Sequence, residues 1–279
     1  TKEEHIKLPY KTSSFRQWAI RLKKYADSSE LLQEKEFWTK KTYPDTILRD
    51  YHFTSLASLE NKSPSLKQIQ GFLSEEYTNF LIYKSNDAYK TQINDILLTA
   101  LALSMCKWTQ QDSVMIGLEG HGREYLFEEL DISRTVGWFT SLFPVVLEIK
   151  NRNIGDLLKS VKEQLRAIPN KGLGYGVLKY ISSDQEIKKA FKEIPNPKII
   201  FNYLGRIDES FDSEFFKFNE FGFSYSSDQI VNEIISIDGA VTGGSLKMSF
   251  GYDVNIHKEF TIQVLANDFI SILKAVIDH

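Results

Sequence analysis

Apolar side chains recur at helical spacing through much of the chain. Phe15 and Trp18 lie three positions apart within residues 13–26, and Ser13 or Ser14 can cap the start of that segment. Including this segment, we predict helices over residues 13–26, about 30–40, 91–108 and 154–167. The third of these helices is apolar on most of its faces, so we expect it to be deeply buried.

Runs of alternating or continuous apolar residues predict β-strands. Glycines at 243–244 mark a hairpin between two such runs, and Ser74 followed by two glutamates begins a helix. Residues 42–64 lack periodicity and predict a surface connector, whereas 267–279 predict a terminal helix capped by its first or second residue. The predicted strands are 66–74, 112–120, 141–149, 198–205, 218–226, 233–241, 245–254 and 260–266.

The order of these elements indicates the fold class. Helices come first, helices and strands then mix, and strands dominate the last part of the chain. We therefore expect an α/β fold with one mixed β-sheet and helices packed mainly on one side of it.

The composition argues against some classes of protein but does not identify the family. Of 279 residues, 42% are hydrophobic and 25% are charged, and the net charge of −3 gives no argument for a nucleic acid or a membrane as partner. The single cysteine excludes an internal disulfide and fits a reducing cytoplasm, where we expect the protein to act. The polar start has no signal peptide and no initiator Met, so we expect a piece of a longer chain. No apolar run in the sequence suggests a membrane span.

The stretch Glu119-Gly120-His121-Gly122-Arg123 follows a buried strand directly. Its glycines allow a sharp turn or a close approach of the backbone to a ligand. A carboxylate beside an imidazole and a guanidinium suits general acid–base chemistry. The alternative is a β-turn decorated with surface charges, a common use of such residues.

Two further stretches carry candidate residues. In one, Arg134 could hold a carboxylate and Trp138 could line a tunnel, or the aromatic pair Trp138 and Phe139 could belong to the core. In the other, Asn202 and Tyr203 are adjacent in a buried strand and must point to opposite faces of the sheet. Either one could face a channel, or both could be structural.

Other chemistries find little support. Residues 169–176 (PNKGLGYG) lack the spacing of a nucleotide-binding loop and predict a turn before short helices that reach about residue 191. The five histidines are scattered, so we predict no metal site. The sequence has no G-x-S-x-G, and Cys106 falls within a predicted helix, so a serine or cysteine nucleophile is also disfavoured.

Together these stretches form an ordered set. NDILLTALAL (94–103), EGHGRE (119–124), RTVGWFTSLFP (134–144), PNKGLGYG (169–176) and FNYLGRID (201–208) resemble the motifs of epimerization domains of non-ribosomal peptide synthetases. These domains belong to the condensation-domain superfamily, which is related to chloramphenicol acetyltransferase. EGHGRE and RTVGWFT also distinguish epimerization domains from ordinary condensation domains.

The resemblance implies a fold, a substrate and partners. The fold would be half of a chloramphenicol-acetyltransferase-like domain, with a mixed, mostly antiparallel sheet. Residues 1–64 would be the lead-in and linker from an N-terminal lobe, and 65–279 the C-terminal lobe. The substrate would be an aminoacyl or peptidyl thioester on the 4'-phosphopantetheine arm of a peptidyl carrier protein, with no cofactor bound directly. A condensation domain of a partner synthetase would act downstream.

The resemblance also implies roles for residues. Glu119 would be a general acid or base, with Asn202 and Tyr203 as further catalytic candidates. Four residues would support them: His121, Arg123, Arg134 and Trp138. Five would border the tunnel for the substrate arm: Gly120, Gly122, Gly172, Gly174 and Tyr175.

One family motif does not occur in this sequence. No two histidines are adjacent, so the His-His-x-x-x-Asp-Gly segment, whose second histidine contributes to catalysis in the family, has no match. We therefore expect the N-terminal lobe to be missing and this chain alone to have little or no epimerase activity. The alternatives are a condensation-type acyltransferase lobe and a non-catalytic module that docks a carrier or a partner.

Overall fold

The computed structural model describes residues 8–46, 65–85, 89–150, 153–207 and 234–279. The chain divides into two compact units. Unit 1 consists of Thr1–Lys41, Gly120–Leu142 and Pro169–Ile194, and unit 2 of Thr42–Glu119, Phe143–Ile168 and Pro195–His279. These units do not follow the predicted division at residue 64, because the lead-in helices cluster with two segments from the middle of the chain.

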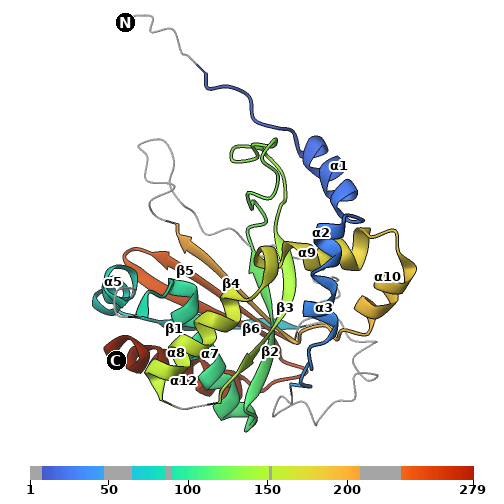
Figure 1. Cartoon of the computed structure of the whole chain (residues 1–279). Helices are drawn as coiled ribbons and strands as arrows, with labels where there is room; N and C mark the ends of the chain where they lie inside the picture. Colours follow the sequence, from blue (N-terminus) through green and yellow to red (C-terminus); the bar gives the residue numbers. More distant parts are fainter. Residues whose placement is uncertain (1–7, 47–64, 86–88, 151–152, 208–233) are drawn as a thin grey trace, which may run out of the picture. The chain divides into compact units, whose positions relative to one another are not determined.

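Unit 2 is built on a six-stranded sheet (Figure 1) with the strand order β1-β6-β5-β4-β2-β3. The pairs β1/β6 and β6/β5 are antiparallel, and β5/β4 and β4/β2 are parallel. The sheet is therefore mixed, as predicted. The strands are β1 Leu66–Phe72, β2 Ser113–Gly120, β3 Ser141–Glu148, β4 Ile199–Arg206, β5 Ile235–Thr242 and β6 Ser245–Asp253.

The predicted hairpin joins β5 to β6. Thr242 pairs with Ser245, and the two residues between them, Gly243 and Gly244, have φ values of 56° and 75°. Two successive positive φ angles suit a two-residue hairpin turn, and glycine adopts them without a steric penalty.

Helices cover one face of this sheet (Figure 1). They are α5 Glu75–Tyr83, α7 Ile93–Thr109, α8 Ile154–Arg166 and α12 Glu259–Asp278. Helix α12 packs on β1, β6, α5 and α7, and α7 also contacts α8. The ring of Phe269 on α12 meets Phe250 on β6 edge-on, with 5.7 Å between the centroids. Helix α7 is buried on most faces, as its composition predicts.

Unit 1 is made of short helices around two aromatic clusters. Trp18 packs against Phe127 and Phe139, and Tyr175 packs between Trp38 and Phe191. The helices are α1 Phe15–Tyr25, α2 Ser29–Leu32, α3 Lys35–Thr39, η2 Pro169–Gly172, α9 Leu173–Gly176, η3 Val177–Ile181 and α10 Gln185–Lys192. Ser14 caps α1, as predicted.

Three predictions of secondary structure were wrong. Residues 260–266 form the first turns of α12 and no strand, because Ile262, Leu265 and Phe269 are buried at helical spacing. The terminal helix therefore begins at Glu259, and neither Asn267 nor Asp268 caps it. The helix predicted from about 30 to 40 is two short helices, interrupted near Glu34, whose carboxylate is buried. The predicted strand 218–226 and most of the predicted connector lie outside the described residues.

Helix α12 also reaches membrane-spanning length, which the apolar pattern of the sequence did not predict. By length and composition alone, α12 could cross a bilayer. No other helix in the described ranges is both long enough and apolar enough to do so. In this structure Leu265, Phe269 and Leu273 are buried, so the apolar length of α12 contributes to the core of unit 2.

Phe269→Ala should destabilise unit 2 strongly. The side chain is fully buried against Phe250, so its removal leaves a cavity and costs about 3–5 kcal/mol. Phe260→Ala on the same helix is the matched control, because Phe260 is 77% exposed and should change stability by only about 0.5 kcal/mol. Urea unfolding followed by circular dichroism measures both, and equal effects would contradict this packing of α12.

Candidate active site

Glu119 lies near the end of β2, where a parallel strand runs beside it. Leu118 pairs with Phe201 in β4, and continuing this register by one residue places Glu119 beside Asn202. Asn202 in turn pairs with Asp238 in β5. Residues at one register position project to the same face of a sheet, so Glu119, Asn202 and Asp238 lie in one row.

This polar row continues across the sheet, and its full membership is Glu119, Asn202, Asp238, Ser249 and Gln70. The neighbouring positions Phe201 and Phe250 are fully buried on the helix-covered face, so the row lies on the opposite face. Glu119 and Asn202 are half-buried and Asp238 is exposed. A carboxylate that can accept a proton thus stands beside an amide that can donate a hydrogen bond.

Sequence reasoning missed Asp238. Its signal was present in the alternation of β5, in which Ile235, Ile237 and Gly239 are buried and the residues between them are not. Only the pairing of β4 with β5 places Asp238 next to Asn202.

Tyr203 lies on the other face of the sheet from Asn202, as the alternation predicts. It pairs with Gly239, and a Cβ at Gly239 would lie 3.3 Å from the Tyr203 ring and 2.7 Å from the Met248 sulfur. Burial raises the pKa of Tyr203, and its hydroxyl is buried with no hydrogen-bond partner within the described part of the chain. The structure thus separates Tyr203 from the row that contains Glu119.

In unit 1, the loop after Gly120 approaches the segment 132–140 very closely. Gly122 has φ +65°, and a Cβ there would lie 1.6 Å from the carbonyl oxygen of Phe139. No side chain fits at that distance, so glycine at this position allows the two backbones to meet.

Arg123 fastens the same two segments together. Its Nη1 donates to the carbonyl of Ile132 at 2.6 Å and its Nη2 to that of Gly137 at 3.4 Å. The guanidinium also lies 4.1 Å from the centroid of the Phe139 ring. These contacts give Arg123 a structural use, and its predicted support of catalysis stays a prediction.

His121 and Glu124 form a second connection in this loop. Nε2 of His121 lies 3.2 Å from Oε1 of Glu124, and Oε2 of Glu124 lies 2.9 Å from Nζ of Lys171. Nδ1 of His121 accepts a hydrogen bond from the Arg123 amide at 3.0 Å. Since Nδ1 accepts, the proton of a neutral imidazole belongs on Nε2, the nitrogen that lies beside Glu124.

The segment around Arg134 and Trp138 holds the N-terminal end of unit 1. Arg134 donates to the carbonyl of Tyr10, and Thr135 Oγ1 donates to the carbonyl of Ser13. Trp138 is 83% exposed, whereas Phe139 is buried, so only the second aromatic belongs to the core. The interpretation of Trp138 as a core residue is thus excluded.

Within the segment 169–176, residues 172–175 are buried, and they pack against α2 and α3. A Cβ at Gly174 would meet the Glu34 carboxylate at 2.1 Å, and Tyr175 is 4% exposed. Gly172 has φ +83° at the start of α9. Gly172, Gly174 and Tyr175 therefore contribute to the packing of unit 1. Their predicted position along a tunnel for the substrate arm stays a prediction.

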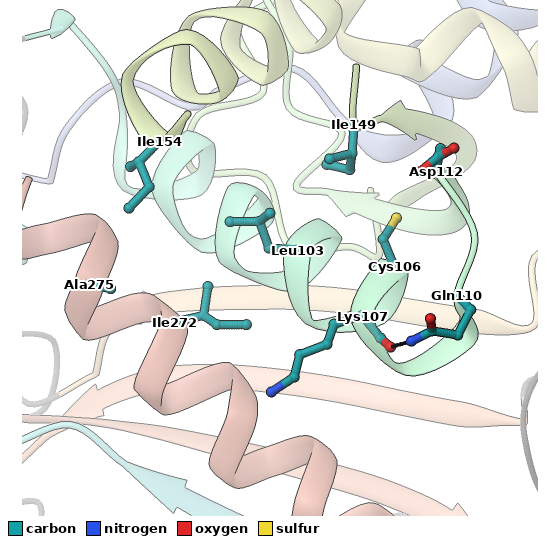
Figure 2. A pocket seen from close by; sticks show the side chains of 9 residues that line it. All are labelled: Leu103, Cys106, Lys107, Gln110, Asp112, Ile149, Ile154, Ile272 and Ala275. Atoms are coloured by element: carbon teal, nitrogen blue, oxygen red, sulfur yellow. Dashed lines mark hydrogen bonds between the residues drawn. The ribbon is translucent and has the colours of Figure 1, made fainter. Parts of the chain in front are cut away.

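The structure also has a pocket of about 310 Å³ in unit 2 (Figure 2). Leu103 and Cys106 of α7 and Ile272 of α12 give it an apolar lining, with Lys107 and Asp112 among its polar residues. Asp112 precedes the start of β2, so the pocket lies about 20 Å along the strand from Glu119. It is therefore separate from the polar row. No group of three potential metal ligands occurs among the residues that the structure describes.

Comparison with known proteins decides the family. The family model for the condensation domain matches residues 1–279. The chain belongs to the condensation domain family. A solved epimerization domain from the third module of tyrocidine synthetase B is 34% identical, with a TM-score of 0.87 over 99% of this chain and 62% of that one. A condensation domain from Monacolin K polyketide synthase is 12% identical with a TM-score of 0.70, which shows the same fold.

Curated relatives of this condensation-family chain are much larger proteins. A linear gramicidin synthase polypeptide of Brevibacillus parabrevis is 41% identical over 98% of this chain and 4% of its own length. Gramicidin S synthase 1 of Brevibacillus brevis is 37% identical over 99% of this chain and 26% of its own. The chain thus spans a small part of the curated relatives that it matches.

Gly122→Ala should destabilise the loop of unit 1. The added Cβ collides with the Phe139 carbonyl and the positive φ is unfavourable for alanine, so the cost exceeds about 1 kcal/mol. Gly176→Ala is the control, because its φ is −65° and a Cβ there meets nothing within 4 Å. Thermal unfolding compares the two, and a neutral Gly122→Ala would contradict the close approach.

Glu34 should make the stability of unit 1 depend on pH. Burial raises the pKa of Glu34 above its ordinary value of 4.5, because desolvation disfavours the carboxylate. The folded state therefore binds the proton more tightly than the unfolded state, and this group loses stability as the pH rises from 4.5 through the folded pKa. Glu34→Gln removes that loss, so its stability relative to wild type should increase across this window. Urea unfolding at a series of pH values measures the difference, and a flat difference would contradict it.

Proposed function

We propose that this chain is part of an epimerization domain of a non-ribosomal peptide synthetase. The contrast in identity carries the proposal: 34% to the solved epimerization domain, against 12% to a condensation domain of the same fold. The motifs EGHGRE and RTVGWFT support the same choice within the family.

The proposed substrate is an L-aminoacyl or peptidyl residue held as a thioester on the phosphopantetheine arm of a carrier protein. A thioester acidifies the adjacent Cα–H, but removal of that proton still needs a placed base and a donor for the developing enolate oxygen. This requirement fits the pairing of a carboxylate with an amide.

Glu119 is the proposed base or acid on one side of the substrate. As a carboxylate it takes the Cα proton of the L residue, and the electron pair of the C–H bond moves into the enolate. The Asn202 amide can donate a hydrogen bond to the thioester oxygen, where the negative charge develops. Return of a proton to the opposite side of Cα gives the D residue. The family resemblance assigns that second position to a histidine outside this chain.

Tyr203 fits this scheme less well than Asn202. It is on the helix-covered face of the sheet, away from the polar row, and burial raises its pKa. Proton transfer is therefore assigned to Glu119, and a proton relay through Tyr203 stays a prediction that its placement disfavours.

Glu119→Gln should abolish exchange of the Cα proton in the full-length protein. The amide retains the shape of the side chain but cannot accept the proton, so the rate should fall by about 10²–10⁴-fold. The measurement is deuterium uptake at Cα of a carrier-bound L-aminoacyl thioester in D2O, with chiral analysis of the product.

Glu128→Gln is the matched control, because Glu128 is an exposed glutamate of the same segment and should leave the rate unchanged. Wild-type exchange in Glu119→Gln would remove Glu119 from the mechanism. Amide-bond formation without Cα exchange in the wild type would favour a condensation-type acyltransferase. Carrier binding with neither reaction would favour a docking module.

A further inference from the structure

Two consecutive residues of unit 1 adopt an unfavourable backbone conformation. Asn170 and Lys171 have φ values of 43° and 49°, in the left-handed region that L residues other than glycine avoid. Two such residues in a row persist only where surrounding contacts hold them, and strain of this kind is enriched near functional sites.

Each of the two side chains is held by a different carboxylate. Asn170 Nδ2 donates to Oε1 of Glu34 at 2.6 Å, and Glu34 is 6% exposed. Lys171 Nζ lies 2.9 Å from Oε2 of Glu124, whose side chain is 16% exposed. The strained turn is therefore fixed to the α2–α3 junction on one side and to the EGHGRE loop on the other.

Glu124 holds two partners at once. One carboxylate oxygen faces Lys171, and the other lies 3.2 Å from Nε2 of His121. The Arg123 amide donates to Nδ1, so the nitrogen that carries the proton of a neutral imidazole is Nε2, the one that lies beside Glu124. The contacts form a continuous series from Lys171 through Glu124 to His121, two residues after Glu119.

We propose that Glu124 and Lys171 are positioning residues that hold His121 and the loop leaving Glu119 in one arrangement. This inference rests on the proposed epimerase function. Glu124 fixes the orientation of the His121 ring, in the way that a carboxylate orients a histidine in metal and catalytic sites, while the Arg123 amide selects the Nε2–H tautomer. Lys171 holds Glu124 in place. The same ion pair connects the strained turn at Asn170 and Lys171 to the loop of residues 120–124. Residues 120–124 follow Glu119 directly, so their fixation limits the conformations of the backbone that bears it.

The proposed role differs from a contribution to stability. Lys171 is 73% exposed and His121 64% exposed, and exposed ion pairs contribute little to folding. A merely structural pair would change neither the Nε2 signal of His121 nor the turnover rate. Lys150→Met is the matched control, because Lys150 pairs with Glu148 at 2.8 Å in unit 2 and is also exposed.

The first experiment uses nitrogen-detected NMR of ¹⁵N-histidine in this chain, with the His121 signals assigned by His121→Gln. The wild type should show the Nε2–H tautomer, and both Glu124→Gln and Lys171→Met should shift the His121 Nε2 signal, because the carboxylate beside that nitrogen is lost or displaced. Lys171→Arg should retain the wild-type signature, since it keeps the charge, and Lys150→Met should have no effect. Unchanged His121 signals in Glu124→Gln and Lys171→Met would overturn the proposal.

The second experiment measures Cα proton exchange in the full-length protein. Glu124→Gln and Lys171→Met should each lower kcat by about ten- to a hundredfold, because a displaced group loses alignment, with KM nearly unchanged. The double variant should lose no more than the larger single effect, and Lys171→Arg should recover most of the rate. If the loss in the double variant instead equals the product of the two single losses, Glu124 and Lys171 act independently, and this would overturn the proposal. If the wild type exchanges no proton, the proposed function fails, and the His121 NMR signals alone then decide the inference.

Discussion

The parallel pairing of β2 with β4 places Gly117 beside Ile200 and Leu118 beside Phe201, residues far apart in the chain. This pairing fixes which side chain stands beside Glu119, because side chains in register share a face of the sheet. It places Asn202 there and puts Tyr203 on the helix-covered face. The adjoining pair β4/β5 then brings Asp238 into the same row. The chemical character of the row thus depends on strand register, since a shift by one residue would exchange Asn202 for an aromatic ring.

A different constraint governs the loop that follows β2. The contact of Gly122 with the Phe139 carbonyl leaves no room for a side chain, and Arg123 donates to two carbonyls that precede Phe139, those of Ile132 and Gly137. Gly122 and Arg123 of EGHGRE therefore have an architectural use that can be stated without reference to a substrate. The motif combines this architecture with the carboxylate of Glu119 near the end of a strand.

Buried Glu34 shows how the helices of unit 1 and the loop 169–176 depend on each other. Glu34 lies between α2 and α3, and its carboxylate meets Asn170 and occupies the space that a side chain at Gly174 would need. Burial of this group is unfavourable for its charged form, which is why its pKa rises. The hydrogen bond from Asn170 offsets part of that cost and at the same time holds a backbone conformation that asparagine tolerates better than most residues.

The amino-acid sequence determined most of the elements and the family of this protein. Local signals sufficed for Ser14 as the cap of α1, for the Gly243-Gly244 hairpin and for the buried α7, because capping, turn and periodicity rules act over a few residues. Residues 260–266 were misassigned, since β-branched and aromatic side chains favour strands locally while burial against the sheet selects the helix. Only the tertiary structure decided that Asp238 stands beside Asn202, that Trp138 is exposed and that Lys171 meets Glu124. Each of these depends on segments distant in sequence, and no local pattern encodes the register or the close approach that brings them together.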